Sequence, residues 1–322
     1  MKIVVLDRLP LDADHDLDWS PLASLGEVTL RDQTLARDTA ARVAGANALY
    51  TNKVRLGAEE MEAAGPGLRF IGVLATGYDV VDIAEAKRRD ITVCNVPSYS
   101  AAFTAQTTIA LLLELCQQFG RHSDSVRTGD WQKRGIWSYR LTPQIELDGR
   151  THVIVGLGTI GRRVAGIAAA LGMRVIAAQL PGRPAPADDP AYPRLPLDEA
   201  LALADSISLH TPLTPETRHL FDANRLAQIK PGARLVNVAR GAVVDDTAIA
   251  DALRTGRLAG YAADVITTEP PAPFNPLLTA PNCVLTPHLA WTSRDARERL
   301  LATSIENLRR FLGGAPQNVV SP

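Results

Sequence analysis

Three residues in the second half of the chain have side chains suited to acid–base chemistry on a small anion. Arg240, Glu269 and His288 each stand at or just beyond the end of a short apolar run. An arginine can hold a carboxylate with two parallel hydrogen bonds. A histidine can donate or accept the proton of a carbinol oxygen, and a nearby carboxylate can orient the ring and stabilise its charged form. Taken singly, each has a plainer structural interpretation; together they predict one catalytic site.

A glycine-rich turn precedes these residues. Gly156, Gly158 and Gly161 form the pattern GxGxxG, with Thr159 and Ile160 in its variable positions, between a Val/Ile run and a helical stretch. The first glycine permits the turn, the second lets backbone approach a pyrophosphate, and the third lets helix and strand pack. The helix N-terminus adds N–H donors. The pattern predicts dinucleotide binding; the alternative is a glycine-rich turn that binds nothing.

The choice of cofactor stays open at this stage. An acidic residue is expected at the end of the second strand, where it would bind a ribose hydroxyl, but that run ends in Gln179. Glutamine can bind the hydroxyl without repelling a 2′-phosphate, and Arg183 could pair with such a phosphate. Arg183 could equally be a solvated loop charge. The sequence therefore predicts NAD(H) or NADP(H).

The elements that must position these residues form an alternating series. The strands expected in the second half are residues 152–155, 174–178, 206–210, 234–238, 260–264 and 283–286. Six strands with helices between most of them match a doubly wound nucleotide-binding sheet. The six prolines within residues 180–196 predict a loop.

The first half has its own strand–helix alternation. Strands are expected at residues 3–6, 48–51, 70–73 and 91–94, with helical stretches such as 81–89 between them. This pattern favours a second parallel sheet.

A long helix and an irregular segment join the two series. The apolar spacing predicts a helix over residues 101–121, followed by an irregular segment at 128–148. Trp131, Trp137 and Tyr139 in that segment could seal a subunit interface or fold onto their own domain.

The chain after His288 is too short for a separate domain. Residues 292–295 fit a capping box, and an apolar stripe follows until Gly313 and Gly314 end the helix. The stripe consists of Leu301, Ile305, Leu308 and Leu312. We expect this tail to pack back on the N-terminal half.

Length and composition narrow the class of protein. A length of 322 residues predicts two domains. The net charge of −1 excludes the overall excess of positive charge that is typical of proteins that bind nucleic acid or an acidic membrane surface. The three cysteines lack a CxxC or a histidine cluster, so neither a disulfide framework nor a metal site is expected. The first residues are typical of a strand rather than a signal peptide, and no apolar run reaches membrane-spanning length. A cytoplasmic protein is predicted.

The order and spacing of these motifs resemble the D-isomer-specific 2-hydroxyacid dehydrogenase family across nearly the whole chain. The stretches concerned are 156–161, VNVARG at 236–241 with Val244 and Asp245, ADV at 263–265 with Glu269-Pro270, and TPH at 286–288. Within the family the chain is most similar to glycerate dehydrogenases, also called hydroxypyruvate reductases. That similarity is carried by residues 74–82, 93–97, 269–271, 275–278 and 288–291.

The resemblance implies a fold and a division of labour. It implies two Rossmann-like or flavodoxin-like α/β domains, each a doubly wound parallel sheet, with the active site in the cleft between them. Residues 1–98 and 289–322 would form a discontinuous substrate-binding domain, and 99–288 the dinucleotide-binding domain. Family members are usually dimers, so a homodimer is expected.

The resemblance also implies roles for individual residues. His288 would be the acid–base group, Glu269 its support, and Arg240 the group that polarises the carbonyl and binds the carboxylate. Besides Arg240, the expected substrate contacts are Lys53, Ala75, Thr76, Gly77 and Trp291. Besides the fingerprint, Gln179, Arg183 and His288, the expected cofactor contacts are Thr107, His210, Thr211, Ala239 and Asp264.

Two hypotheses about function come from different classes. The first is an enzyme that reduces hydroxypyruvate, glyoxylate or another small 2-keto acid to the D-2-hydroxy acid. The second is a dinucleotide-sensing binding protein, because transcriptional co-repressors with this fold keep the same three residues. The charge near zero and the lack of an added interaction segment weigh against the second.

Overall fold

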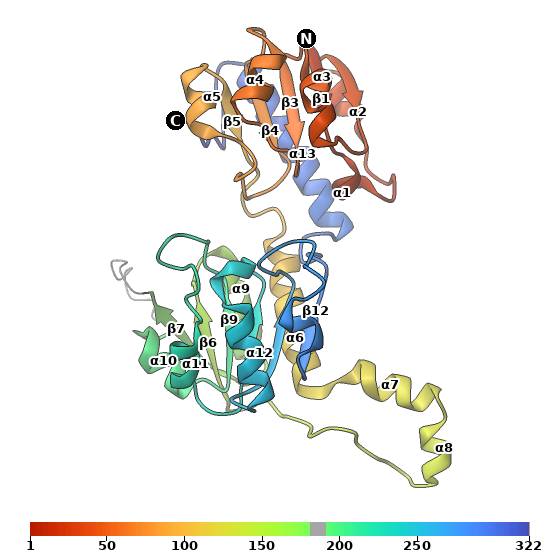
Figure 1. Cartoon of the computed structure of the whole chain (residues 1–322), viewed down its shortest axis with the longest axis vertical. Coiled ribbons are helices and arrows are strands. Elements are labelled where there is room, and N and C mark those ends of the chain that lie inside the picture. The colour runs from red at the N-terminus through yellow and green to blue at the C-terminus, as the bar shows by residue number, and fades with distance from the viewer. Residues whose placement is uncertain (181–190, 322) are drawn as a thin grey trace. The chain divides into compact units, whose positions relative to one another are not determined.

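A computed structural model describes residues 1–180 and 191–321 (Figure 1). Contacts divide the chain into two compact units. The first holds Met1–Ser100 and the chain from Trp291 onward, and the second holds Ala101–Ala290. Each crossing lies two residues beyond the position expected from the sequence.

The first unit is built on a five-stranded parallel sheet in the order β2-β1-β3-β4-β5. Its strands are β1 (Lys2–Val5), β2 (Glu27–Leu30), β3 (Ala48–Thr51), β4 (Phe70–Val73) and β5 (Thr92–Cys94). Its helices are α1 (Leu9–Asp12), α2 (Ser20–Ala23), α3 (Thr39–Val43), α4 (Ala58–Ala64), α5 (Ile83–Arg88) and α13 (Arg294–Leu312). The strand order is flavodoxin-like, with its switch point between β1 and β3. Strand β2 was not predicted from the sequence, because it is an edge strand that is only partly buried.

The tail packs on this unit through α13. Leu301, Ile305 and Leu308 are buried in the same apolar core as residues of β1, β3 and β4, which confirms most of the predicted stripe. Leu312 was wrongly included, because 49% of it is exposed. The N-cap is Ser293, whose hydroxyl accepts from the backbone N–H of Ala296 at 3.3 Å, so the capping box expected to start at residue 292 is also wrong.

The second unit holds a seven-stranded parallel sheet in the order β12-β11-β10-β9-β6-β7-β8. Its strands are β6 (Thr151–Val155), β7 (Arg174–Gln179), β8 (Arg194–Pro196), β9 (Ser206–Leu209), β10 (Ala233–Asn237), β11 (Leu258–Ala263) and β12 (Cys283–Leu285). In chain order this is the Rossmann arrangement with one strand added, and the order reverses between β6 and β9. β8 corrects the prediction that all of residues 180–196 form a loop.

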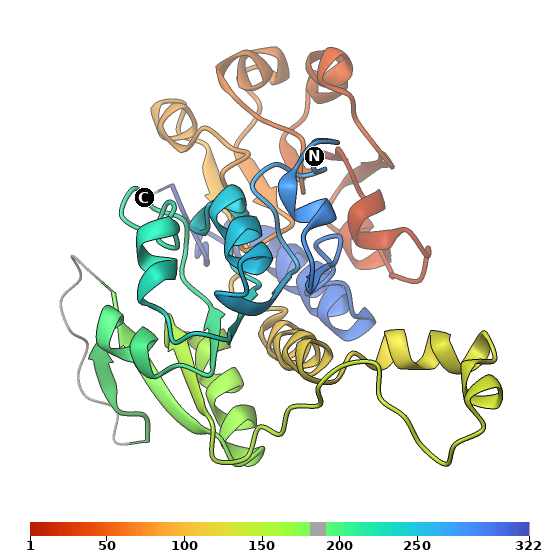
Figure 2. The ribbon, with the colours of Figure 1, turned by 60° about the horizontal axis from the view of Figure 1, so that its bottom comes forward.

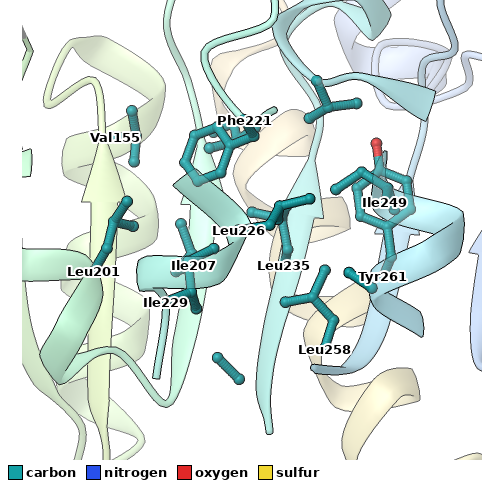
Figure 3. Close-up of a cluster of buried hydrophobic side chains, with 14 of the residues drawn as sticks. Val155, Leu201, Ile207, Phe221, Leu226, Ile229, Leu235, Ile249, Leu258 and Tyr261 are labelled. Carbon is teal, nitrogen blue, oxygen red and sulfur yellow. The ribbon is translucent and has the colours of Figure 1, made fainter. Parts of the chain in front are cut away.

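Helices cover both faces of this sheet. They are α6 (Ala101–Gln117), α9 (Thr159–Ala170), α10 (Leu197–Leu203), α11 (Ala223–Gln228) and α12 (Asp246–Arg254). Helices α6 and α9 pack together on one face. The other face meets α10, α11 and α12 in an apolar core around Ile207, Leu235 and Phe221 (Figure 3). The odd-numbered residues of β9 and β10 thus face α10–α12, and the even-numbered ones face α6 and α9.

The segment 119–139, which follows α6, extends from the second unit as an arm. The long helix ends at Gln117, four residues earlier than expected, because Gln118 takes a left-handed backbone at φ 48°. Two further helices follow, α7 (Phe119–Arg127) and α8 (Asp130–Arg134), so the segment expected to be irregular contains a helix. Figures 1 and 2 show this arm reaching away from the sheet of its own unit.

Among residues 1–180 and 191–321, no helix is both long and apolar enough to cross a membrane.

Candidate active site

The clearest catalytic geometry in the second unit is an acid–base pair. The Nδ1 atom of His288 lies 2.6 Å from Oε2 of Glu269, and the backbone N–H of Ile266 donates to Oε1 of the same carboxylate at 3.2 Å. The two side chains remain 31% and 37% exposed, so a ligand can reach them. Because Glu269 engages Nδ1, the other ring nitrogen of His288 is the one placed to exchange a proton with a substrate.

A buried carboxylate holds the segment that carries His288. Asp264 follows β11 and is 1% exposed. It accepts from the hydroxyl of Thr286 at 2.6 Å and from the backbone N–H groups of Leu289 and Ala290 at 2.8 Å each. Burial raises the pKa of Asp264, while these hydrogen bonds and nearby His288 oppose the rise. Asp264 thus braces the chain on both sides of His288; its contact with a cofactor stays a prediction.

Arg240 lies in the turn after β10, close to the loop that bears Glu269. Asn237 shapes this turn, since its side chain accepts from Ala239 N–H and donates to the Arg240 carbonyl, both at 3.0 Å. A Cβ at Gly241 would lie 1.9 Å from the backbone carbon of Ile266, so only glycine lets the two loops approach this closely. The geometry therefore brings the Arg240 turn against the Glu269 loop, with the Arg240 side chain half-buried.

The fingerprint turn has the shape that a pyrophosphate requires. Gly156 has φ 101°, and a Cβ at Gly161 would lie 2.2 Å from the Gly156 carbonyl oxygen, so both positions need glycine. A Cβ at Gly158 would meet nothing within 4 Å, and no side chain caps the following helix α9. The first N–H groups of α9, starting at Thr159 and Ile160, are therefore open to an anion. The residues present fit a bound dinucleotide.

The other predicted cofactor residues lie in the same unit. Gln179 is half-buried at the end of β7. His210 and Thr211 follow β9, and the backbone of His210 touches the fingerprint: a Cβ at Gly156 would lie 2.7 Å from the His210 carbonyl oxygen. Thr107 in α6 is buried, and Ala239 is half-buried before Arg240. Arg183 lies outside the described residues.

The first unit presents a second set of polar groups at its own switch point. Asp7 follows β1 and is 4% exposed. Its carboxylate accepts from the backbone N–H groups of Asn52 (2.8 Å), Lys53 (2.6 Å) and Val54 (3.2 Å), which follow β3. Burial raises the pKa of Asp7, and these hydrogen bonds oppose the rise. Asp7 thus fixes the turn from which the exposed Lys53 side chain extends.

The segment Ala75–Gly77 is held by two asparagines. Asn95 donates to the Thr76 carbonyl at 2.7 Å, while the Thr76 hydroxyl donates to the Val96 carbonyl at 2.8 Å. Asn52 donates to the Leu74 carbonyl at 2.6 Å. Trp291 belongs to this unit and packs edge-on against Tyr99, with ring centroids 6.4 Å apart.

These bracing groups were mostly missed from the sequence. No supporting role is predicted for Asp7, which directly follows the first predicted strand, or for the asparagines at 52, 95 and 237. A polar residue at the end of a predicted parallel strand was the available signal. Their partners lie on other segments of the chain, so the pairings themselves needed the fold.

Comparison with known proteins decides the family. Residues 109–290 match the family described as D-isomer specific 2-hydroxyacid dehydrogenase, NAD binding domain. The chain belongs to the D-isomer-specific 2-hydroxyacid dehydrogenase family. Family membership makes it an NAD-dependent oxidoreductase, confirming the resemblance inferred from its motifs.

Named members of the dehydrogenase family match over nearly full length. The chain is 42% identical to a hydroxypyruvate reductase from Blautia hydrogenotrophica, covering 100% of both chains. It is 34% identical to a glycerate dehydrogenase from Methylorubrum extorquens, over 99% of this chain and 98% of the other. Its fold resembles an NADPH-dependent glyoxylate/hydroxypyruvate reductase from Sinorhizobium meliloti, solved with citrate, at a TM-score of 0.85 and 27% identity, over 100% of this chain and 98% of that one.

Proposed function

We propose that this dehydrogenase reduces a small 2-keto acid, hydroxypyruvate or glyoxylate, to the 2-hydroxy acid, which has the D configuration when the product is chiral. The observation that carries the proposal is the His288–Glu269 hydrogen bond at 2.6 Å, close to the Arg240 turn in an NAD-binding domain. A proton donor and a cation are the groups that carbonyl reduction requires, because the carbonyl oxygen gains negative charge as it is reduced.

The residues divide the reaction among them. A reduced nicotinamide, when bound, supplies the hydride to the keto carbon and is oxidised. His288 as imidazolium delivers a proton from Nε2 to the carbonyl oxygen, which completes the hydroxyl group. Glu269 stabilises the imidazolium before transfer. Arg240 polarises the carbonyl and binds the substrate carboxylate.

In the first unit, we assign substrate binding to Lys53 and to the segment Ala75–Gly77. Asp7 orients the backbone of the Lys53 turn, which leaves the ammonium group exposed for an anion. Asn95 and Asn52 fix the chain around Thr76, so that its N–H groups can be presented in a constant geometry. Trp291 is proposed as an apolar wall of the pocket. Small anionic keto acids suit this combination of one lysine and backbone donors.

The names of the relatives support this substrate class. A hydroxypyruvate reductase and a glycerate dehydrogenase catalyse the same reaction and are named for its opposite directions. Both match almost the whole chain. The Sinorhizobium meliloti reductase is NADPH-dependent, so a protein of this fold uses a cofactor that carries a 2′-phosphate. Gln179, which lacks a carboxylate, suits NADPH as well as NADH.

We also propose that two copies pair through the arm. Its apolar side chains are unusually exposed: 90% for Trp137, 51% for Ile136 and 46% for Trp131. The arm is nonetheless ordered, since Ser125 bonds to Asp130 at 2.7 Å and Trp131 stacks edge-on against Tyr139. An arm with internal contacts and exposed aromatic groups is typical of a surface that a second copy covers. A cytoplasmic location stays a prediction.

A panel of 2-keto acids tests the proposal. The purified chain is given hydroxypyruvate, glyoxylate, pyruvate or phenylpyruvate with NADH and NADPH in parallel, and the product is resolved by chiral chromatography. We expect cofactor oxidation with hydroxypyruvate and glyoxylate, and a D-product from hydroxypyruvate. Oxidation only with pyruvate or phenylpyruvate would assign a different substrate, and an L-product would refute the assigned stereochemistry.

A further inference from the structure

A buried chain of hydrogen bonds crosses the two strands at which the sheet order reverses. On β6, His152 Nδ1 lies 2.7 Å from Ser206 Oγ, and His152 Nε2 lies 2.9 Å from Ser208 Oγ, both on the neighbouring strand β9. Ser208 Oγ also lies 2.9 Å from Nε2 of His210, just beyond β9. In this parallel pair His152 aligns with Ser206, so its ring reaches along the strand to Ser208 as well.

The surroundings make these contacts obligatory rather than incidental. His152 and Ser208 are fully buried, and Ser206 is 2% exposed. They share a sheet face with Ile154, which packs in the apolar core against α6 and α9. A polar group in such a place is costly unless it is hydrogen-bonded. Each serine hydroxyl hydrogen in this site therefore needs an acceptor.

Both imidazole rings are neutral at pH 7. Burial lowers the pKa of His152 to about 4. Burial, reinforced by repulsion from His152, lowers the pKa of His210 to about 3. Each neutral ring carries one N–H, and which nitrogen holds it is set by the partners of that ring.

Ser208 couples the two rings. Its hydroxyl has one hydrogen but faces two Nε2 atoms, so it can donate to only one of them. The other Nε2 must carry a hydrogen and donate to Ser208 Oγ, because two lone pairs would otherwise face each other. Consequently one histidine is protonated at Nε2, and the other is protonated at Nδ1.

Ser206 decides between the two arrangements. If its hydroxyl donates to His152 Nδ1, then His152 carries its hydrogen on Nε2, donates to Ser208, and Ser208 donates to His210 Nε2. In the reverse arrangement His152 Nδ1–H would donate to Ser206 Oγ, and the Ser206 hydrogen would lack an acceptor, because among the described residues the only hydrogen bond found for that hydroxyl is the one to His152. The first arrangement satisfies every hydroxyl hydrogen, and it leaves His210 protonated at Nδ1.

His210 stands where a dinucleotide would lie. Its backbone N–H donates to the Val155 carbonyl at 2.8 Å, and its carbonyl abuts the fingerprint residue Gly156. Within the described part of the chain its Nδ1 atom is buried and makes no hydrogen bond. A bound ligand with an oxygen acceptor would supply the hydrogen bond that His210 Nδ1 lacks.

We propose that His152 is a positioning residue for cofactor binding: through Ser208 it holds His210 in the Nδ1–H tautomer, so that His210 offers a hydrogen-bond donor to an oxygen of the bound dinucleotide. This inference rests on the proposed function for its ligand. The network itself belongs to the chain alone, so it can be tested without any cofactor.

The first test is nuclear magnetic resonance of the full chain with ¹⁵N-labelled histidine and no ligand. Two-bond ¹H–¹⁵N correlations distinguish protonated from unprotonated ring nitrogens, and loss of signals in His210→Asn and His152→Gln identifies the two residues among the six histidines. We expect His152 to carry its hydrogen on Nε2 and His210 on Nδ1. Either ring found in the opposite tautomer overturns the proposal, and a wild-type spectrum with no ring protonated at Nδ1 would overturn it without any variant.

The second test compares variants of His152. His152→Gln keeps a donor that can reach Ser208, whereas His152→Met keeps apolar bulk without one. We expect the glutamine variant to retain the Nδ1–H tautomer of His210, and the methionine variant to lose it. Dissociation constants for NADH should rise by roughly 2- to 10-fold in His152→Met, the loss of about one hydrogen bond, and less in His152→Gln.

A matched control separates positioning from packing. Ile154→Val lies on the same strand and face and removes only a methyl group, so the tautomer of His210 should not change. A His210 tautomer that is unchanged in His152→Met would show that His152 only fills the core. If the wild-type chain shows the expected tautomers but binds neither NADH nor NADPH, the proposed function fails while the network stands.

Discussion

The Nδ1 atom of His288 lies 2.6 Å from the Oε2 atom of Glu269. This contact joins the loop after β11 to the turn after β12, and Asp264 braces that turn from the other side. The histidine is therefore held at one nitrogen by a carboxylate and left open at the other. That is the arrangement an acid–base group needs if its ring is to keep one orientation through a catalytic cycle.

Replacing Glu269 by glutamine should lower kcat while leaving cofactor binding intact. A hydrogen bond to a charged group contributes about 1.5–3 kcal/mol, so we expect kcat to fall roughly 10- to 100-fold. Stopped-flow or steady-state assays with hydroxypyruvate measure the change. Glu298→Gln, which breaks an exposed ion pair with Arg294, is the control and should stay within about twofold of wild type. Equal effects of the two substitutions would remove Glu269 from the mechanism.

Gln179 should govern the choice between NADH and NADPH. An aspartate at this position would repel the 2′-phosphate of NADPH, so Gln179→Asp should shift the ratio of kcat/KM values toward NADH by at least roughly 10-fold. Gln179→Asn shortens the side chain without adding charge and should not produce that shift. A ratio unaffected by the aspartate would mean that Gln179 does not face the ribose.

The arm should control the oligomeric state. A charge at the most exposed aromatic residue of the arm, as in Trp137→Glu, should convert a dimer into monomers in light scattering coupled to size-exclusion chromatography. Phe274→Glu alters a side chain that is 95% exposed but lies outside the arm, and it should leave the mass unchanged. A wild-type monomer, or a Trp137→Glu dimer, contradicts the assigned interface.

Acid should destabilise the dinucleotide-binding unit through its buried histidines. The pKa of His152 is about 4 in the folded chain and 6.5 in the reference state. Below pH 6.5 His152 binds a proton in the unfolded chain but not in the folded chain. The contribution of neutral His152 to the free energy of unfolding is therefore fully present above pH 6.5 and is lost as the pH falls toward 4. His152 alone should lower the free energy of unfolding by about 2 kcal/mol between pH 7 and pH 5. Urea denaturation at the two pH values measures this loss. His152→Met should show a smaller loss, and an identical loss would refute the assignment.

Much of the fold was predictable from local pattern. The runs at residues 48–51 and 70–73 match β3 and β4 residue for residue, because fully buried parallel strands are continuous apolar segments. The elements that were missed lack that signal. Glu27–Leu30 is a half-exposed edge strand, Arg194–Pro196 follows a proline-rich stretch, and the end of α6 depends on the backbone of a single residue, Gln118.

The reacting residues of the candidate site were predictable from the sequence, but the residues that hold them in position were not. Arg240, Glu269 and His288 follow strands, and parallel strands bring such positions to one edge. The roles of Asp7, Asn237 and Ser208 come from partners on other segments, which neither spacing nor composition specifies. His152 illustrates the point: in the sequence it is one polar residue in an apolar strand, and only the register with β9 pairs it with two serines.

The most direct test of the catalytic assignment is NADH and NADPH oxidation with hydroxypyruvate by wild type, His288→Asn and His15→Asn. Both histidines have left-handed backbones, at φ 54° and 53°, and asparagine tolerates that conformation, so the two substitutions are matched. We predict that wild type turns over, that His15→Asn stays within about twofold of it, and that His288→Asn loses about 10²- to 10⁴-fold in kcat. A wild-type chain that oxidises neither cofactor with any short 2-keto acid, or a His288→Asn variant at the wild-type rate, would contradict the account.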